Sequence, residues 1–403
     1  MTNEPEPGPD RRLAAGHADA AGGARVLLIK SMPLERDSRS QKMVAEYRRR
    51  GSRVINLLWT RGDPVAEEED LVAFRRAGRY GAKLGSLFNY MLWLGFIART
   101  IVRLRKSIEI IHLVDFNTAL VGVPLGRLFG KLVVYDAGDH FAQVFPQGSW
   151  RWRLSARWER RLVERSDLAI FPDPIRLTQY GVEHIRHACI VGNIPEEDTA
   201  VLPDPAASRP CSGPFTMVYI GTLEAEHRGL EYVPRLCADH PGRIAFIVGG
   251  LGQLTDYFRE QAEGLDNLAY VGPQPYAEAL RLMAGADALY GPYLLSTPAH
   301  LYAAPNKMYE HLLLGRPLIT NSGTPPAALV EAHGTGFLFD GSYEALDRLV
   351  ASLDRDACAK AGARARRLWE VEYRDLRQRQ VEEYFVALNA KLAPGRLRAE
   401  AGR

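Results

Sequence analysis

The stretch APNKMYEHLLLGRPLI, residues 304–319, leads from the start of an apolar helix into a strand. Pro305 suits the first turn of a helix, where its missing N–H group costs nothing, and Gly315 suits the helix end. Lys307 and Glu310 follow one helical turn apart, so their side chains share one face. They form either an ordinary surface ion pair or a cation and a carboxylate offered to one ligand.

Length and composition indicate a globular protein with two domains. The chain has 403 residues, of which 46% are hydrophobic and 25% are charged. The net charge of +3 gives no support for a nucleic-acid partner. The four cysteines have no CxxC or metal-like spacing, which indicates a reducing compartment and buried packing roles: Cys189, Cys211, Cys237 and Cys358.

The ends of the chain and its most apolar segment bear on localisation. Residues 1–24 are rich in Pro, Gly, Ala and charge and lack the apolar core of a signal peptide, so we expect a disordered cytoplasmic tail. No run reaches the ~18 apolar residues of a transmembrane helix. The nearest, residues 84–104, is interrupted by polar and charged residues. It is either a buried core helix or an interfacial helix that also touches a membrane.

Short runs of β-branched residues and leucine alternate with helical stretches along the chain. This alternation predicts βαβ units and parallel sheets. The segment SQKMVAEYRRRG, residues 40–51, is a predicted helix that ends at Gly51. The strands predicted in the first half are residues 24–30, 53–59, 108–114, 131–137 and 167–172.

Residues 196–214 contain four prolines and no periodicity, which predicts a linker between two α/β series. The predicted fold class is therefore α/β, with two doubly wound Rossmann-like domains that face each other across a cleft. The predicted parts are a tail (1–24), an N-terminal domain (25–200), a linker (201–213), a C-terminal domain (214–368) and a helix that returns to the first domain (369–393).

Four segments of the second half carry a resemblance to a known family. They are GTLEAEHRGLE (221–231), IVGGLGQL (247–254), NLAYVGPQPYAEALRLMAGADALYGPY (267–293) and PNKMYEHLLLGRPLI (305–319). In this order they resemble the donor domain of the group 1 (family 4) glycosyltransferases, which have the GT-B fold. IIHLVD, VVYDAGDHF and WERRLVERSDLAIFP extend the resemblance over the first half.

The resemblance implies a retaining glycosyltransferase that moves a sugar from a nucleotide-diphospho-sugar to a hydroxyl acceptor, without a metal or other cofactor. Lys307 and the helix start would face the diphosphate, and Glu310 would bind the ribose hydroxyls. Arg228 would clamp the diphosphate, unless it is a solvated loop arginine. The other implied donor-binding positions are Thr222, Gly272 and Asn306, of which Gly272 is otherwise a plain turn glycine.

The chain departs from the family pattern at two positions. Tyr302 stands where many members have a first glutamate, although a branch with a PNK-type sequence before the helix also lacks it. Gly138 stands where the family often has a histidine, within VVYDAGDHF. The first departure bears on contacts to the donor sugar, and the second on the acceptor side.

On the acceptor side, Asp136 matches the family motif. Asp139 and His140 are expected to orient or polarise the acceptor hydroxyl, or else to cap the next turn. His112 matches another frequent family histidine, or is structural. In the loop LIKSMPLERDSRS, Asp37 and Arg39 are expected to bind acceptor or sugar hydroxyls; helix capping by Asp37 or Ser38 is the alternative.

The predicted catalytic set is Asp139, His140, Arg228 and Lys307. The helix SWRWRLSARWERRLVERSD, with three tryptophans and six arginines, either packs on the core or touches anionic lipid. The expected partners are a nucleotide-sugar and a hydroxyl acceptor, with a lipid-linked acceptor at the inner face of the cytoplasmic membrane favoured. The alternative functions are a non-catalytic GT-B scaffold and a GT-B sugar-nucleotide epimerase. The triplet Asp354–Asp356 is DxD-like but lies in a predicted helix.

Overall fold

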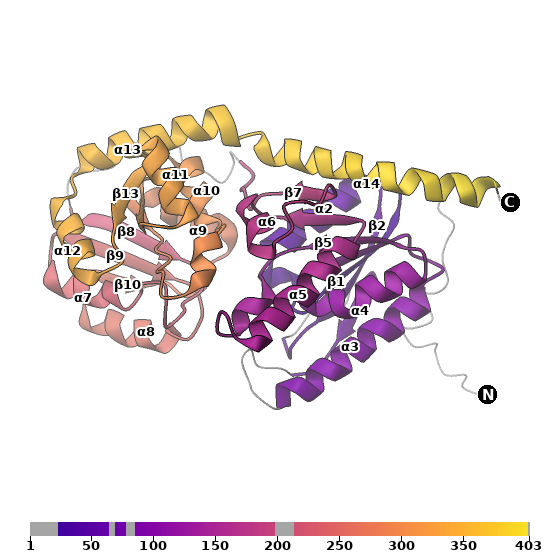
Figure 1. The fold of residues 1–403 in the computed structure, drawn as a ribbon. Coiled ribbons are helices and arrows are strands. Elements are labelled where there is room, and N and C mark those ends of the chain that lie inside the picture. Colours follow the sequence, from indigo (N-terminus) through magenta and orange to yellow (C-terminus); the bar gives the residue numbers. More distant parts are fainter. Residues whose placement is uncertain (1–22, 64–68, 78–84, 198–212, 402–403) are drawn as a thin grey trace, which may run out of the picture. The chain divides into compact units, whose positions relative to one another are not determined.

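The computed structural model describes residues 23–63, 69–77, 85–197 and 213–401 (Figure 1). The chain divides into two compact units. The first contains Met1–Val191 and Glu382–Arg403, and the second contains Gly192–Val381. The predicted tail lies outside the described residues except for residues 23 and 24, and the predicted linker does so except for Gly213.

The first unit is built on a parallel sheet with the strand order β3-β2-β1-β4-β5-β6-β7. All residues of β4 and β5 are buried, as expected for central strands covered on both faces. The strands are β1 (Arg25–Lys30), β2 (Arg53–Trp59), β3 (Leu71–Phe74), β4 (Ile110–Val114), β5 (Leu132–Asp136), β6 (Leu168–Phe171) and β7 (Ala188–Ile190).

The handedness of crossover connections determines which face of this sheet each helix covers. The helix α2 connects β1 to β2, which lies toward the β3 edge of the sheet. The helices α3, α4 and α5 connect β3 to β4, β4 to β5 and β5 to β6, which run toward the β7 edge. These three helices therefore share the other face (Figure 1). The helices are α2 (Ser38–Arg49), α3 (Gly85–Leu104), α4 (Asp115–Leu128), α5 (Trp150–Arg165), α6 (Ile175–Tyr180) and α14 (Leu376–Ala401), which enters this unit at Glu382.

The second unit has a six-stranded parallel sheet in the order β10-β9-β8-β11-β12-β13. Its strands are β8 (Phe215–Ile220), β9 (Ile244–Gly249), β10 (Leu268–Tyr270), β11 (Ala288–Tyr290), β12 (Leu318–Asn321) and β13 (Gly336–Phe339). Its helices are α7 (Tyr232–Asp239), α8 (Thr255–Gly264), α9 (Tyr276–Gly285), α10 (Lys307–Leu314), α11 (Pro325–His333), α12 (Tyr343–Ser352) and α13 (Arg355–Leu368).

These two sheets confirm the predicted fold class of two doubly wound domains. Successive strands are added toward one edge of the sheet and then toward the other, and this switch falls between β1 and β4 in one sheet and between β8 and β11 in the other. Loops diverge at such switch points, which leaves room for a ligand at the carboxyl ends of the strands. The strand β3 was not predicted, because its four residues form a short edge strand without a long apolar run.

The helices α2 and α10 end at the two glycines that the sequence predicted. Gly51, with φ of +78°, follows α2, and Gly315, with φ of +59°, caps α10. In both cases the chain adopts the left-handed conformation that ends a helix, which glycine adopts without steric cost.

Backbone hydrogen bonds tie the loops after β8, β9 and β10 into one edge. Gly221 N donates to Gly249 O (3.0 Å), and Gly250 N donates to Gly272 O (2.8 Å). Gly250 has φ of +129°, and a Cβ there would lie 1.8 Å from Gly221 O. Only a glycine permits this approach, so this part of IVGGLGQL is required for the edge to form.

The substitution Gly250→Ala is expected to destabilise the protein by about 2 kcal/mol or more, because it adds a backbone clash to a strained φ. Urea unfolding followed by circular dichroism measures the change. Gly264→Ala, at the end of α8 where a Cβ meets nothing within 4 Å, is the control. Equal stability of the two variants would contradict the close approach.

Candidate functional site

Lys307 is the first residue of α10, and its side chain is buried. Its Nζ donates a hydrogen bond to the carbonyl oxygen of Ile220, the last residue of β8. The same Nζ lies 4.3 Å from the centre of the Tyr219 ring, so the aromatic face also stabilises the cation. A Cβ on Gly221 would lie 3.0 Å from Nζ. The ammonium group therefore lies at the carboxyl end of β8, beside the switch point.

The electrostatics at Lys307 favour an anionic ligand. Burial lowers the pKa of Lys307 from 10.5 to about 8; the carboxylate of Glu310 opposes this and the charge of Arg228 adds to it. A buried ammonium is incompletely compensated by its neighbours, so a phosphate would stabilise its charged form. Lys307, Glu310 and Arg228 are thus close enough to affect one another's charge.

Arg228 is held from two sides. Its Nε donates to Glu224 Oε2 (2.8 Å), and its guanidinium carbon lies 4.4 Å from the centre of the Tyr293 ring. Its side chain is 19% exposed, which places it in the wall of the site and leaves it accessible to a ligand. Tyr293 is fixed in turn, because its N–H donates to Asn321 Oδ1 (2.5 Å).

Glu310 is buried one turn after Lys307, and the hydroxyl group of Tyr276 hydrogen-bonds to it. Asn306 precedes Lys307 and is exposed. Its carbonyl oxygen accepts from Tyr309 N and Glu310 N, both at 2.9 Å. The first N–H groups of a helix have no acceptor within the helix, so this end of α10 can donate to an anion.

The remaining predicted donor positions belong to the same unit. Thr222 is exposed, and its carbonyl oxygen accepts from the Tyr219 hydroxyl (2.7 Å). Gly272 has φ of +69° and open space where a Cβ would be. Tyr302 is half-buried at the end of a short 3-10 helix, Pro298–Tyr302. Thr222 is thus exposed and Gly272 half-buried, in the loops that follow β8 and β10.

A series of buried polar groups connects the predicted acceptor-side residues of the first unit. Arg39 donates from Nε (3.0 Å) and Nη2 (2.8 Å) to Asp136 Oδ1. His112 lies between Asp136 Oδ2 (3.4 Å) and the Tyr47 hydroxyl (3.1 Å), which contacts the Tyr384 hydroxyl. Burial opposes ionisation of Asp136, but Arg39 and His112 hold its pKa well below the usual range. His112 and Asp136 are fully buried and therefore position Arg39.

Asp37 caps the helix α2. Its Oδ1 accepts from Arg39 N (3.1 Å), and its Oδ2 accepts from the Ser40 hydroxyl (2.5 Å). The capping alternative for Asp37 is therefore confirmed. The same carboxylate pairs with the buried ammonium of Lys30, the last residue of β1.

Asp115 lies against Gly138, the position where the family resemblance would place a histidine. Asp115 begins α4 with φ of +67°, and its Oδ1 accepts from Gly138 N (3.0 Å) and Asp139 N (3.2 Å). A Cβ at Gly138 would lie 2.5 Å from that oxygen, so any side chain at this position would have to displace the Asp115 carboxylate. Burial raises the pKa of Asp115 to about 6, against the opposing charge of Lys30.

Asp139 and His140, which were predicted together on the acceptor side, differ in burial. The Asp139 side chain is fully exposed, whereas His140 is 4% exposed. His140 Nε2 lies 3.4 Å from Glu159 Oε2, and its ring packs on Tyr180. Burial lowers the pKa of His140 to about 4 and raises that of Glu159 to about 8. Asp139 is therefore the accessible member of the pair, and His140 is a neutral part of the core.

The sequence reasoning missed the three tyrosines of the donor-side unit, Tyr219, Tyr276 and Tyr293, and two charged groups of the first unit, Lys30 and Asp115. Four of them lie at a strand end or helix start, which was the available signal, and Tyr293 lies in the loop three residues after β11. Their contacts join segments far apart in the sequence, so periodicity alone did not reveal them.

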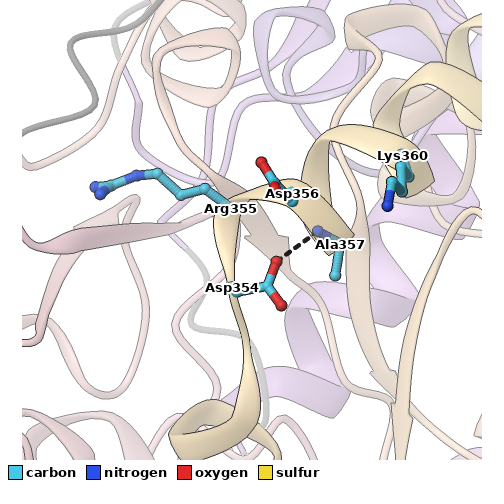
Figure 2. A pocket seen from close by; sticks show the side chains of 5 residues that line it. All are labelled: Asp354, Arg355, Asp356, Ala357 and Lys360. Carbon is cyan, nitrogen blue, oxygen red and sulfur yellow. Dashed lines mark hydrogen bonds between the residues drawn. The ribbon is translucent and has the colours of Figure 1, made fainter.

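The DxD-like triplet has a structural role (Figure 2). Asp354 caps α13 by accepting from Ala357 N (2.7 Å). The Arg355 side chain points away from Asp356, and Lys360 lies one turn along the helix. Within the described ranges there is no group of three or more His, Cys, Asp or Glu side chains arranged to hold a metal ion.

Comparisons with known proteins agree with the fold. The solved structure of HepE from Anabaena in complex with UDP-glucose matches with a TM-score of 0.64 at 15% identity, covering 91% of this chain and all of that one. Sucrose-phosphate synthase from Thermosynechococcus elongatus matches with a TM-score of 0.62 at 16% identity, over 94% of this chain and 100% of that one. The chain therefore has the GT-B fold.

Sequence similarity alone reaches less far. No family model matches the chain. Glycogen synthase of Mycobacterium tuberculosis is 31% identical over 170 residues, which is 40% of this chain and 39% of that protein. The chain thus matches well under half the length of this curated relative.

The substitution Glu159→Gln tests the buried carboxyl group. The pKa of Glu159 is about 8 in the folded state and 4.5 ordinarily, so between these pH values only the folded state keeps the proton. Stability of the natural protein should fall as pH rises from about 5 to 8, on the order of 2 kcal/mol more than in the variant. Urea midpoints at both pH values measure this. Glu164→Gln, on the same helix, is the control; no difference between Glu159→Gln and the natural protein would contradict the assignment.

Proposed function

We propose that this protein is a retaining glycosyltransferase that moves a sugar from a nucleotide-diphospho-sugar to a hydroxyl acceptor, in cell-envelope polysaccharide, glycolipid or natural-product biosynthesis. The observation that carries this proposal is the buried ammonium of Lys307 at the end of β8, with Arg228 and Glu310 beside it. HepE, described in complex with UDP-glucose and with UDP, supports a uridine diphosphate sugar as the first donor to test.

The second unit would act on the departing diphosphate. As the bond from the anomeric carbon to the phosphate oxygen breaks, negative charge grows on the diphosphate, next to Lys307, Arg228 and the start of α10. These groups are already in place, so they stabilise the transition state more than the ground state. Glu310 would accept hydrogen bonds from the ribose, with its carboxylate held by Tyr276. These cations do the work that a metal ion would do, so no metal is needed.

The first unit would hold the acceptor. The accessible Asp139, together with Asp115 and Lys30 at the ends of β4 and β1, can bind hydroxyl groups. Arg39, positioned by Asp136, is 14% exposed and can donate to the same ligand. The acceptor oxygen attacks the anomeric carbon on the face that the phosphate leaves, and its proton passes to the departing phosphate. This accounts for retention without a protein nucleophile.

Two other functions are compatible with the same fold. A non-catalytic scaffold is motivated by Tyr302 and Gly138, but it has no need for a buried lysine at the position of Lys307. A sugar-nucleotide epimerase would convert the donor without an acceptor. A cytoplasmic location is part of the proposal, because nucleotide-sugars are made and used there.

Substituting Lys307 tests the function. Lys307→Met keeps the buried volume but removes the charge, so transfer from a uridine diphosphate sugar should fall by about 10²–10³-fold. Glu310→Ala should abolish the thermal stabilisation that the natural protein shows with the preferred donor, about 2.7 kcal/mol at 100 times the dissociation constant.

Lys360→Ala, an exposed lysine of α13 in the same unit, is the matched control and should leave both measurements unchanged. Near-normal transfer by Lys307→Met would contradict the proposed role of Lys307 in stabilising the diphosphate. No stabilisation by any member of a nucleotide-sugar panel would favour the scaffold, and donor conversion without an acceptor would favour the epimerase.

Donor affinity should depend on pH through Lys307. The pKa of this lysine is about 8 in the free site. A bound diphosphate stabilises the cation and raises that pKa, so binding takes up a proton above pH 8. Donor affinity should therefore be flat below pH 8 and fall by up to about tenfold between pH 8 and 9. Calorimetry in buffers of different ionisation enthalpy measures the proton uptake. Lys307→Arg should flatten the pH profile of donor affinity, because arginine stays charged at these pH values. An unchanged slope in that variant would show that another group causes the pH dependence.

A further inference from the structure

The helix α5 carries an apolar stripe that no described part of the chain covers. Trp150, Leu154 and Trp158 are 68%, 48% and 47% exposed and follow one another at four-residue intervals, so they lie on one face. The opposite face packs into the core through Glu159 and Val163, and Leu162, one turn after Trp158, is buried as well. The stripe is therefore part of a helix whose position is fixed by its other side.

A second apolar stripe lies at the start of α3. Leu87, Phe88 and Met91 are 61%, 64% and 59% exposed. Trp93 and Ile97, on the other side of the same helix, are fully buried. By length and composition alone, Leu87–Leu104 is also the one helix of the described residues that could cross a membrane. Because its inner face belongs to the core of the first unit, we expect it to remain packed there and offer only its outer face.

The two stripes share a face and an edge of the first unit. The helices α3, α4 and α5 cover the same face of the sheet (Figure 1), and α4 contacts both neighbours. Each of the three runs back from the carboxyl end of a strand, so the first turns of α3 and α5 lie toward that edge. Between Asp115 and Arg127, α4 has no charged residue. The helix between the two stripes thus contributes no charged side chain from Phe116 to Gly126.

Cations lie beside the α5 stripe and farther along α3. On α5, Arg151, Arg153, Arg157 and Arg161 are exposed beside the tryptophan stripe. Arg99, Arg105 and Lys106 are exposed on and after α3. Of the two acidic residues of α5, Glu159 is buried and Glu164 accepts from Arg160 Nε (2.9 Å).

The apolar stripes and the cations beside them together indicate what binds this surface. Tryptophan and leucine suit the boundary between headgroups and acyl chains, and arginines suit the phosphates of anionic lipids. We propose that the α3–α5 face, defined by these two stripes and the cations beside them, binds the surface of an anionic bilayer. The carboxyl edge of the sheet, with Asp115 and Asp139, would then lie near the bilayer. A lipid-linked acceptor follows as a corollary that rests on the proposed function.

Vesicle co-sedimentation of the full chain tests the proposal. The protein should sediment with vesicles of equimolar phosphatidylglycerol and phosphatidylcholine but not with phosphatidylcholine alone, and rising salt should weaken binding. The double variant Trp150→Ser/Trp158→Ser should lose about tenfold or more in vesicle affinity, and Arg153→Glu/Arg157→Glu should do the same. Tryptophan emission should shift to shorter wavelength on binding.

Val386→Ser, an exposed apolar residue of α14, and Lys360→Glu are the matched controls and should bind as the natural protein does. Thermal unfolding checks that every variant is folded. The proposal is overturned by the absence of binding to anionic vesicles, by equal binding to both vesicles, or by binding that neither double variant weakens. A dimer in solution that the tryptophan variant dissociates would also overturn it, in favour of a second copy of this chain. Donor stabilisation is measured without vesicles, so the two proposals can fail separately.

Discussion

A lysine ammonium buried at the end of a central strand is the constraint on which the second unit depends. Removing such a group from water is costly, and here the cost is offset by the Ile220 carbonyl oxygen, the Tyr219 ring and the charge of Glu310. Each partner comes from β8 or α10, so strand and helix must meet at one point. A Cβ on Gly221 would lie 3.0 Å from the ammonium nitrogen, so the glycine at this position leaves room for it. A cation that its surroundings compensate only in part is a natural phosphate site.

In the first unit the corresponding constraint is the buried Asp136. Its carboxylate holds Arg39 from α2 and His112 from β4, and through Tyr47 this set reaches Tyr384 of α14. The last helix of the chain is thereby joined to the sheet by polar contacts in addition to packing. His112 and Asp136, which were predicted on the acceptor side, are fully buried and position Arg39.

Much of this architecture could be predicted from local patterns. Alternating apolar runs predicted the parallel strands, and Gly51 and Gly315 predicted helix ends, because these signals act over a few residues. Lys307, Glu310 and Arg228 were predicted together through family resemblance. Tyr219, Tyr276 and Tyr293 were not, because an aromatic side chain at a strand end gives no local sign of the cation or carboxylate that it will contact. The exposed Asp139 and the buried His140 are adjacent in sequence, and no pattern distinguished their burial.

The sequence by itself therefore determined the doubly wound fold class, since periodicity and turn residues are local properties, and family resemblance supplied the residues predicted to bind the donor. Tertiary structure alone decided which of these groups are charged, buried or accessible. The pKa of Lys307 falls and those of Asp115 and Glu159 rise because distant segments remove water from around them. It also decided that Gly138 accommodates the Asp115 carboxylate, and that Trp150 and Trp158 of α5 face outward. Burial and the charges of neighbours depend on the packing of segments remote in sequence, which is why only the folded chain defines them.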